Sequence, residues 1–145
     1  MTFQIERLGF AELCDFLRVQ AEDSFPDLKE EVRLKMLAEK WSNNADFSTC
    51  RDNDGHLVGM IAFYANVKGA DVAYIPHVYV SPQHRKEGLF TIMLEKVEDY
   101  VKAKGYLQIK LEVAKDNAIA ISAYLKKGFI VDHTTSGNTN YMIKK

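Results

Sequence analysis

Residues 78–90 read VYVSPQHRKEGLF, a hydrophobic strand that runs into a short polar loop and then into a helix. The first amide groups of a helix have no partner inside the helix and carry partial positive charge, so an anion such as a pyrophosphate binds well there. Gly88 lets the backbone approach that anion closely, and Arg85 and Lys86 add positive charge beside it. The stretch is equally compatible with a plain strand–loop–helix connection whose charged side chains are solvated.

Two common phosphate-binding loops are absent from the sequence. The glycine pattern G-x-G-x-x-G, which marks a dinucleotide-binding βαβ unit, does not occur, and neither does the phosphate loop G-x-x-x-x-G-K-[ST]. If the helix start at Gly88 binds an anion, it does so with a loop of another type.

A second block, residues 111–129, reads LEVAKDNAIAISAYLKKGF and predicts another strand followed by a helix. Apolar and polar residues alternate strictly over residues 107–113, which indicates a strand with one polar face. Asp116 or Asn117 then caps a helix whose apolar stripe includes Ile121 and Leu125, and Gly128 ends it.

The rest of the chain alternates between strand and helix patterns. Residues 2–8 predict a strand, 10–21 a helix, and 28–41 a second helix that is capped by Asp27 and has Val32 and Met36 among its apolar positions. Residues 45–51 and 56–66 flank the turn sequence DNDG at 52–55, which is a hairpin signal because these residues tolerate positive φ. Further strands are expected at 72–80, 107–113, 129–133 and 140–143, and a third helix at 88–104. This order predicts an α/β protein with a mixed sheet of about seven strands and about four helices on its two faces.

Taken together, the two blocks resemble the GNAT acetyltransferase superfamily. Its first signature is a strand ending in V-x-V and then a loop with R/Q-x-x-G-x-G/A, which corresponds here to Val78, Val80 and residues 85–90. Its second is a strand ending in V followed by N-x-x-A-x-x-x-Y-x-x-x-G-F, carried here by Val113, Asn117, Ala120, Tyr124, Gly128 and Phe129. The resemblance implies a GNAT-type central mixed, mostly antiparallel twisted sheet, with residues 1–145 as a single domain.

The family binds acetyl-coenzyme A (acetyl-CoA), and the resemblance assigns parts of that site. The backbone at the V-x-V strand end would bond the pantetheine arm, in a cleft where the strand splays from its neighbour. Residues 85–91 would hold the pyrophosphate, and Asn117 would contact the arm. The implied cofactor-binding set is Val78, Tyr79, Val80, Arg85, Lys86, Glu87, Gly88, Leu89, Phe90, Thr91, Asn117 and Tyr124.

The implied reaction is direct attack of a neutral primary amine on the thioester. Negative charge builds on the carbonyl oxygen, where a backbone N–H near Val80 stabilises it. Tyr124 matches the family tyrosine that protonates the leaving thiolate, although a half-buried aromatic residue on an amphipathic helix would show the same pattern.

Two positions depart from the family pattern. Phe90 replaces a small residue, so its ring must point away from the cofactor if binding is to be kept. Many members carry a glutamate near the position of Tyr74, and none stands here, so His77 and Tyr74 are the candidates to assist amine deprotonation. His77 is equally compatible with a strand histidine paired to a neighbour, and a β-bulge would decide which way it faces.

Composition excludes several other classes. The net charge of −1 argues against a general nucleic-acid binder. No cationic start with an apolar run and no stretch of ~20 apolar residues is present, so a cytoplasmic protein without a membrane partner is expected. Cys14 and Cys50 match no metal spacing and are interpreted as buried thiols, and no metal is expected.

The function predicted is therefore N-acetyltransfer from acetyl-CoA to the amine of an unidentified small molecule or peptide. A homodimer is only a family-level expectation. The alternatives are a non-catalytic acyl-CoA-binding module or sensor, and an interaction protein without a cofactor.

Overall fold

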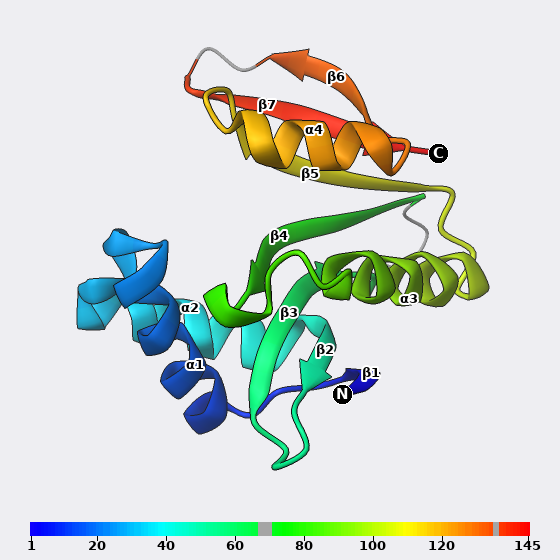
Figure 1. The fold of residues 1–145 in the computed structure, drawn as a ribbon. Coiled ribbons are helices and arrows are strands. Elements are labelled where there is room, and N and C mark those ends of the chain that lie inside the picture. Colours follow the sequence, from blue (N-terminus) through cyan, green and yellow to red (C-terminus); the bar gives the residue numbers. More distant parts are fainter. Residues whose placement is uncertain (67–70, 135–136) are drawn as a thin grey trace.

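The described residues form one seven-stranded sheet in the order β1-β2-β3-β4-β5-β7-β6 (Figure 1). Every neighbouring pair is antiparallel except β4 and β5, which run parallel. This computed structural model describes residues 1–66, 71–134 and 137–145. The strands are β1 (Thr2–Glu6), β2 (Asp46–Arg51), β3 (Leu57–Tyr64), β4 (Val72–Val80), β5 (Gln108–Ala114), β6 (Ile130–Thr134) and β7 (Thr139–Lys144). The predicted mixed, mostly antiparallel sheet is confirmed.

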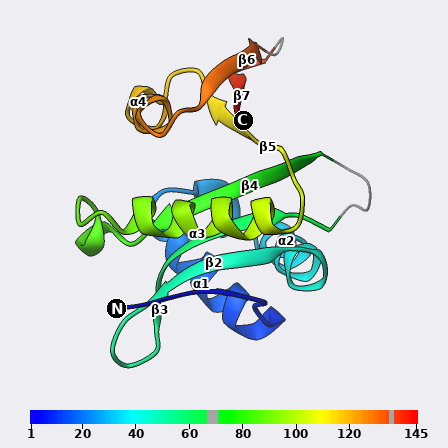
Figure 2. The ribbon, with the colours of Figure 1, turned by 90° about the vertical axis from the view of Figure 1, so that its right-hand side faces the viewer.

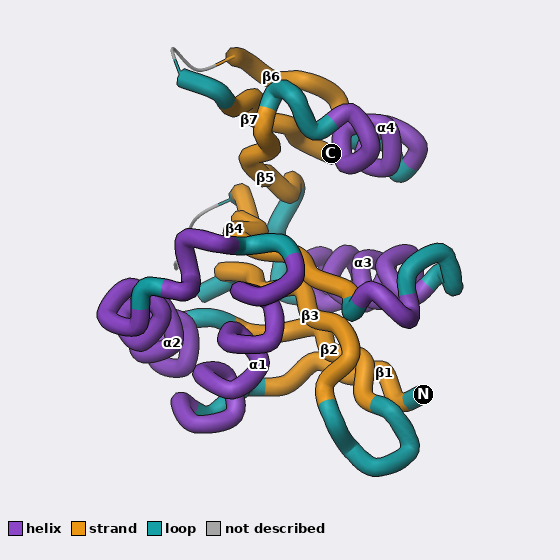
Figure 3. Tube along the Cα trace, turned by 60° about the vertical axis from the view of Figure 1, so that its left-hand side comes forward, coloured by secondary structure: helices purple, strands orange, loops and turns teal. Residues whose placement is uncertain are grey.

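Helices cover the two faces of this sheet (Figures 2 and 3). On one face lie α1 (Phe10–Asp23) and α2 (Glu31–Asn44), joined by the 3₁₀ turn η1 (Pro26–Lys29); on the other lie α3 (Leu89–Ala103), preceded by η2 (Pro82–His84), and α4 (Ala118–Lys126). Each face has its own apolar core, with Phe63 and Met93 on the α3 side and Leu34 and Phe47 on the α1–α2 side. None of the helices in the described ranges has the length and apolar character needed to cross a bilayer.

Strand β4 holds the feature that positions the site. Its ladder to β3 pairs Tyr74 with Tyr64 but His77 with Ala62, so β4 carries one extra residue, a bulge, at Ile75 or Pro76. Its ladder to β5 runs only from Val72 to Ile75, which pairs with Leu111. Beyond Ile75 the two strands diverge, as Figure 1 shows. The expected splay is therefore present, and one edge of β4 is left without a strand partner in the described chain.

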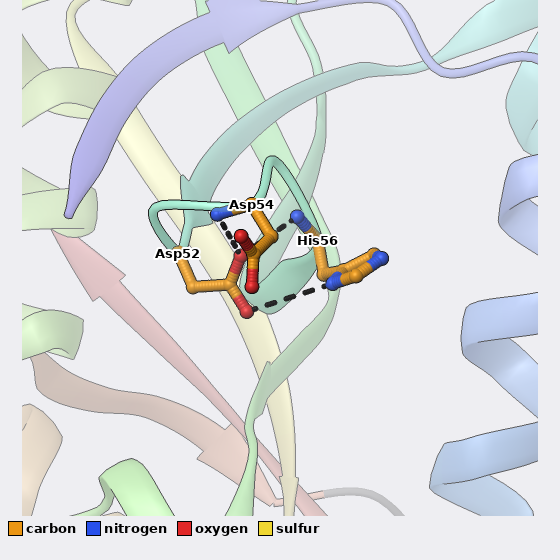
Figure 4. A group of neighbouring side chains, drawn as sticks. All are labelled: Asp52, Asp54 and His56. Carbon is orange, nitrogen blue, oxygen red and sulfur yellow. Dashed lines mark hydrogen bonds and ion pairs between the residues drawn. The ribbon is translucent and has the colours of Figure 1, made fainter.

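The predicted hairpin between β2 and β3 is confirmed (Figure 4). Gly55 has φ 83°, and the amide of Asp52 bonds the carbonyl of His56 at 3.0 Å. Oδ1 of Asp52 accepts the amides of Asp54 and His56 at 2.9 and 3.0 Å. The His56 amide is the main cause that lowers the pKa of Asp52, and the Asp54 amide adds to it. Asp52, Asp54 and His56 lie close enough together to suggest a metal site, but the bonds that close the turn already explain why they are grouped.

The start of α2 corrects the predicted boundary. The chain makes the turn η1 after Phe25, and the α-helix begins only at Glu31. Its cap is Glu30, whose carboxylate accepts the amides of Val32 and Arg33 at 3.1 and 2.9 Å, so the prediction of Asp27 as the cap was wrong. Proline at residue 26 favours the tight first turn, which shifts the α-helix along the chain.

Candidate functional site

A groove of about 670 Å³ opens where β4 splays from β5. Its walls are formed by β4, by the loop that precedes α3, by the first turn of α3, and by α4. The lining residues are Val78, Val80, His84, Arg85, Lys86, Gly88, Leu89, Phe90, Asn117, Ile119, Ala120, Ala123 and Tyr124. The two sequence blocks that are more than twenty residues apart in the chain thus meet around one space.

The bulge in β4 determines which side chains enter the groove. Val78 and Val80 pack toward the core beneath α3, whereas His77 and Tyr79 project to the opposite face. Without the extra residue, alternation along the strand would place His77 on the same face as Ile75, which lies in the α3-side core.

The start of α3 has the geometry of an anion site. Gly88 is its N-cap in the left-handed region, at φ 79° and ψ 9°, and Lys86 also has positive φ, at 68°. No side chain of the described residues caps this helix, in contrast to α2 and α4. The amides of Leu89, Phe90 and Thr91 precede the first intrahelical bond, from Ile92 to Gly88 at 3.3 Å, and so remain available to a ligand.

Arg85 is bound to other parts of the chain. Its Nε donates to the carbonyl of Val80 at 2.9 Å, its guanidinium pairs with Asp23 at the end of α1, and it lies over the ring of Tyr79 at 5.6 Å. These contacts join the loop to β4 and α1. Arg85 therefore fixes the position of the loop that forms this wall of the groove. Lys86, in the same lining, makes no ion pair with a described residue.

Asn117 and Tyr124 enter the groove from α4. Oδ1 of Asn117 accepts the amide of Ala120 at 3.1 Å, as predicted for a cap, which leaves the side-chain NH₂ as a donor. Burial raises the pKa of Tyr124 to about 12, so its hydroxyl stays protonated at neutral pH. The ring packs edge-on between Phe90, at 5.8 Å, and Phe129, at 5.7 Å. Phe90 thereby forms a wall of the groove, and its ring does not fill the space beside it.

His77 lines a second cavity, of about 390 Å³, on the α1–α2 face. Its ring packs at a tilt against Phe25, with ring centroids 4.6 Å apart, and against Trp41, at 5.1 Å. Its Nε2 lies 2.6 Å from Oε1 of the fully buried Gln20. Burial lowers the pKa of His77 to about 4. Because Gln20 presents an oxygen, we assign the proton to Nε2, which leaves Nδ1 as an acceptor.

Tyr74 lines neither of these two cavities. It is half-buried on the α1–α2 face of the sheet, and burial, followed by the carboxylate of Glu112, raises its pKa.

Most of the expected cofactor residues line the groove, with three exceptions. Tyr79 faces the α1–α2 core, Glu87 turns outward to His84 at 3.3 Å, and Thr91 lines an adjoining hollow. Four lining residues lie outside the expected set, namely His84, Ile119, Ala120 and Ala123. Ala120 belongs to the second sequence signature, and its spacing from Asn117 and Tyr124 already marked the face of α4 on which Ile119 and Ala123 also lie.

Comparison with known proteins agrees with this geometry. The profile of the "Acetyltransferase (GNAT) family" matches residues 10–129. An uncharacterized N-acetyltransferase of Methanocaldococcus jannaschii is 32% identical over 138 residues, covering 88% of this chain and 61% of its own length. A spermidine N(1)-acetyltransferase of Thermoplasma acidophilum is 29% identical over 92 residues, covering 63% of this chain and 55% of its own. The chain thus spans about three fifths of the length of these relatives.

Solved structures show the same fold. The PaiA N-acetyltransferase of Thermoplasma acidophilum, solved in complex with coenzyme A, superposes with a TM-score of 0.77 at 24% identity, and the alignment covers 100% of this chain and 99% of that one. An acetyltransferase of the GNAT family from Staphylococcus aureus gives a TM-score of 0.75 at 16% identity over 99% of this chain and 98% of that one. Profile, relatives and fold agree, and the chain belongs to the GNAT acetyltransferase family.

Proposed function

We propose that this protein transfers an acetyl group from acetyl-CoA to a primary amine. The observation that carries the proposal is the groove in which a splayed strand end, an uncapped helix start and Tyr124 face one space. Each element suits one part of an acyl-CoA: an extended arm, a diphosphate and a thioester sulfur.

The cofactor is proposed to lie along the free edge of β4. Its pantetheine arm is amide-bearing and extended, so it can add to β4 as a further strand where β5 has diverged. The side-chain NH₂ of Asn117 is the donor for this arm from the α4 side. The diphosphate would then lie against the amides of residues 89–91, with Lys86 as a cation of the same lining that forms no ion pair with a described residue.

The chemistry follows from this placement. The amine nitrogen attacks the thioester carbonyl carbon, the C–S bond breaks, and the proton lost by the amine balances the one gained by the thiolate. The hydroxyl of Tyr124, which its raised pKa keeps protonated, donates a hydrogen bond to the departing sulfur. The proton that the amine releases is the one that the thiolate finally takes up, so Tyr124 ends the reaction protonated. A backbone N–H of β4 near Val80 is the proposed donor to the carbonyl oxygen.

The amine is proposed to enter from the opposite face. Pro76 and His77 line the second cavity and Val78 lines the groove, so the two spaces approach β4 from opposite sides just beyond its last pair with β5. Nδ1 of His77 is an acceptor for the amine, and His77 is the candidate to assist its deprotonation, because Tyr74 lines neither space. Aromatic walls from Phe25 and Trp41 suit the aliphatic part of such a substrate.

A thiol-release assay with acetyl-CoA and a panel of amines tests the proposal. The panel contains a polyamine, an amino sugar, an amino acid and a peptide amine. We expect free thiol in at least one reaction and an acetyl mass increment on that amine. Saturable binding of acetyl-CoA without thiol release in any reaction would contradict catalysis and support a non-catalytic binding module.

A further inference from the structure

The groove does not end at Phe90. A hollow of about 540 Å³, distinct from the cavity around His77, adjoins the groove along α4. It shares Phe90, Ile119 and Ala123 with the groove. Its lining is Phe90, Thr91, Ala118, Ile119, Ser122, Ala123, Lys126 and Lys127. A ligand whose diphosphate lies at the start of α3 can therefore continue into this hollow.

The floor of the hollow is one face of α4. Its residues recur every four positions along the helix, first 118 and 119, then 122 and 123, then 126 and 127. Eight positions at ~1.5 Å each give a floor of ~12 Å, enough for a nucleoside with a phosphate. The small side chains of Ala118, Ser122 and Ala123 keep it open, and Ile119, which is 87% exposed, offers an apolar surface for a planar base.

The far end of this floor is positively charged. Lys126 and Lys127 are the charged residues of the lining, and neither forms an ion pair with another described residue. Lysine at the last turn of a helix is in part explained by the helix dipole, which a cation there stabilises. The dipole does not explain why both residues line a hollow that adjoins the groove.

We propose that Lys126 and Lys127 bind the 3′-phosphate of coenzyme A and let the protein distinguish coenzyme A from its 3′-dephospho form. The inference rests on the proposed cofactor site, because it follows the ligand onward from the diphosphate at residues 89–91. The adenosine lies over Ile119, and its 3′-phosphate, a dianion, meets the two ammonium groups. No bond is made or broken.

Titration calorimetry with coenzyme A and with 3′-dephospho-coenzyme A tests this inference. For the parent protein at low salt we expect coenzyme A to bind about five- to tenfold more tightly, the scale of two exposed charge pairs. The preference should shrink as salt is added, since salt screens exposed charges. The double variant Lys126→Gln, Lys127→Gln should lose the preference for coenzyme A. It should bind the dephospho form as tightly as the parent does, and this binding shows that the variant is folded.

A matched control is Lys102→Gln, because Lys102 lies in the last turn of α3 and lines neither space. It should keep the parent's preference. Equal affinities for the two ligands in the parent overturn the inference and leave the proposed function standing. A preference that survives in the double variant overturns the assignment to these lysines. Absence of heat with either ligand overturns both the inference and the function on which it rests.

Discussion

In the proposed mechanism, Tyr124 is the residue closest to the chemical step. Its ring is held between Phe90 and Phe129, so removal of the hydroxyl leaves the packing in place. A pKa of about 12 keeps the proton on the oxygen through the range in which an amine is neutral. The proposed donor therefore needs no activation.

Tyr124→Phe should lower kcat by about ten- to hundredfold, the lower range for loss of a general acid. The affinity for acetyl-CoA should stay within about threefold of the parent, because the aromatic contacts remain. Steady-state thiol release and calorimetry measure the two quantities. A variant with the parent's kcat would show that the thiolate leaves without help from this tyrosine.

His77 lines the cavity proposed for the amine, and its burial makes the folded protein less stable in acid. Its pKa in the folded protein is about 4 against 6.5 for an exposed histidine, because burial disfavours the charged ring. As the pH falls from 6.5 toward 4, the unfolded chain takes up a proton here and the folded chain does not. His77 therefore contributes stability that is complete above pH 6.5 and is lost as the pH falls toward 4.

This linkage predicts a slope in the free energy of unfolding of about 1.4 kcal/mol per pH unit from His77 alone, or about 2–3 kcal/mol over the interval. Urea denaturation at several pH values measures it. His77→Gln should flatten the slope, whereas His56→Gln, at the exposed hairpin turn, should keep it. Identical slopes in the parent and the His77 variant would show that His77 titrates normally in the folded protein.

At the scale of elements, the start of α3 offers a test with an internal control. Gly88 and Gly55 have nearly the same conformation, with φ 79° and 83°, and a Cβ added at either meets no atom within 4 Å. Alanine at either position therefore costs backbone strain of about 1 kcal/mol without a clash. Only Gly88 lines the groove.

Gly88→Ala and Gly55→Ala should lower the free energy of unfolding by similar amounts. Only Gly88→Ala should weaken coenzyme A binding, by about tenfold, since its Cβ would occupy the approach to the helix amides. Thermal denaturation and calorimetry separate the two effects. If both variants bind coenzyme A as the parent does, the ligand does not approach the helix at this glycine.

The elements differ in how far the sequence predicts them. The hairpin, α3 and α4 were predictable because glycine, asparagine and apolar spacing are local signals. The bulge at Ile75 or Pro76 was left open: the sequence allowed a bulge before His77, and Pro76 is compatible with one, but only the register against β3 establishes it. The start of α2 was misplaced because Asp27 is a favoured type of N-cap residue and glutamate is not, whereas the turn η1 moves the helix start to Glu31 and leaves Glu30 as its cap.

At the scale of the whole molecule, the groove was predictable and the second cavity was not. Two sequence blocks, each strand–loop–helix, indicated the cofactor side. The cavity around His77 depends on Phe25 and Trp41, which reach it from far along the chain, and on the buried Gln20. The ion pair between Arg85 and Asp23 likewise joins residues that are sixty-two positions apart in the sequence. Such contacts follow from packing of helices on a sheet, which no local pattern reveals.

Coenzyme A is proposed to bind to the free edge of β4 and the first turn of α3. Titration of ¹⁵N-labelled protein with coenzyme A, followed by amide chemical shifts, tests it directly in a chain of 16.5 kDa. The largest shifts are expected at residues 78–80 and 88–91, with the amide of Gly105, beyond the opposite end of α3, unmoved. No saturable shift, or shifts confined to residues outside the groove, would contradict the account.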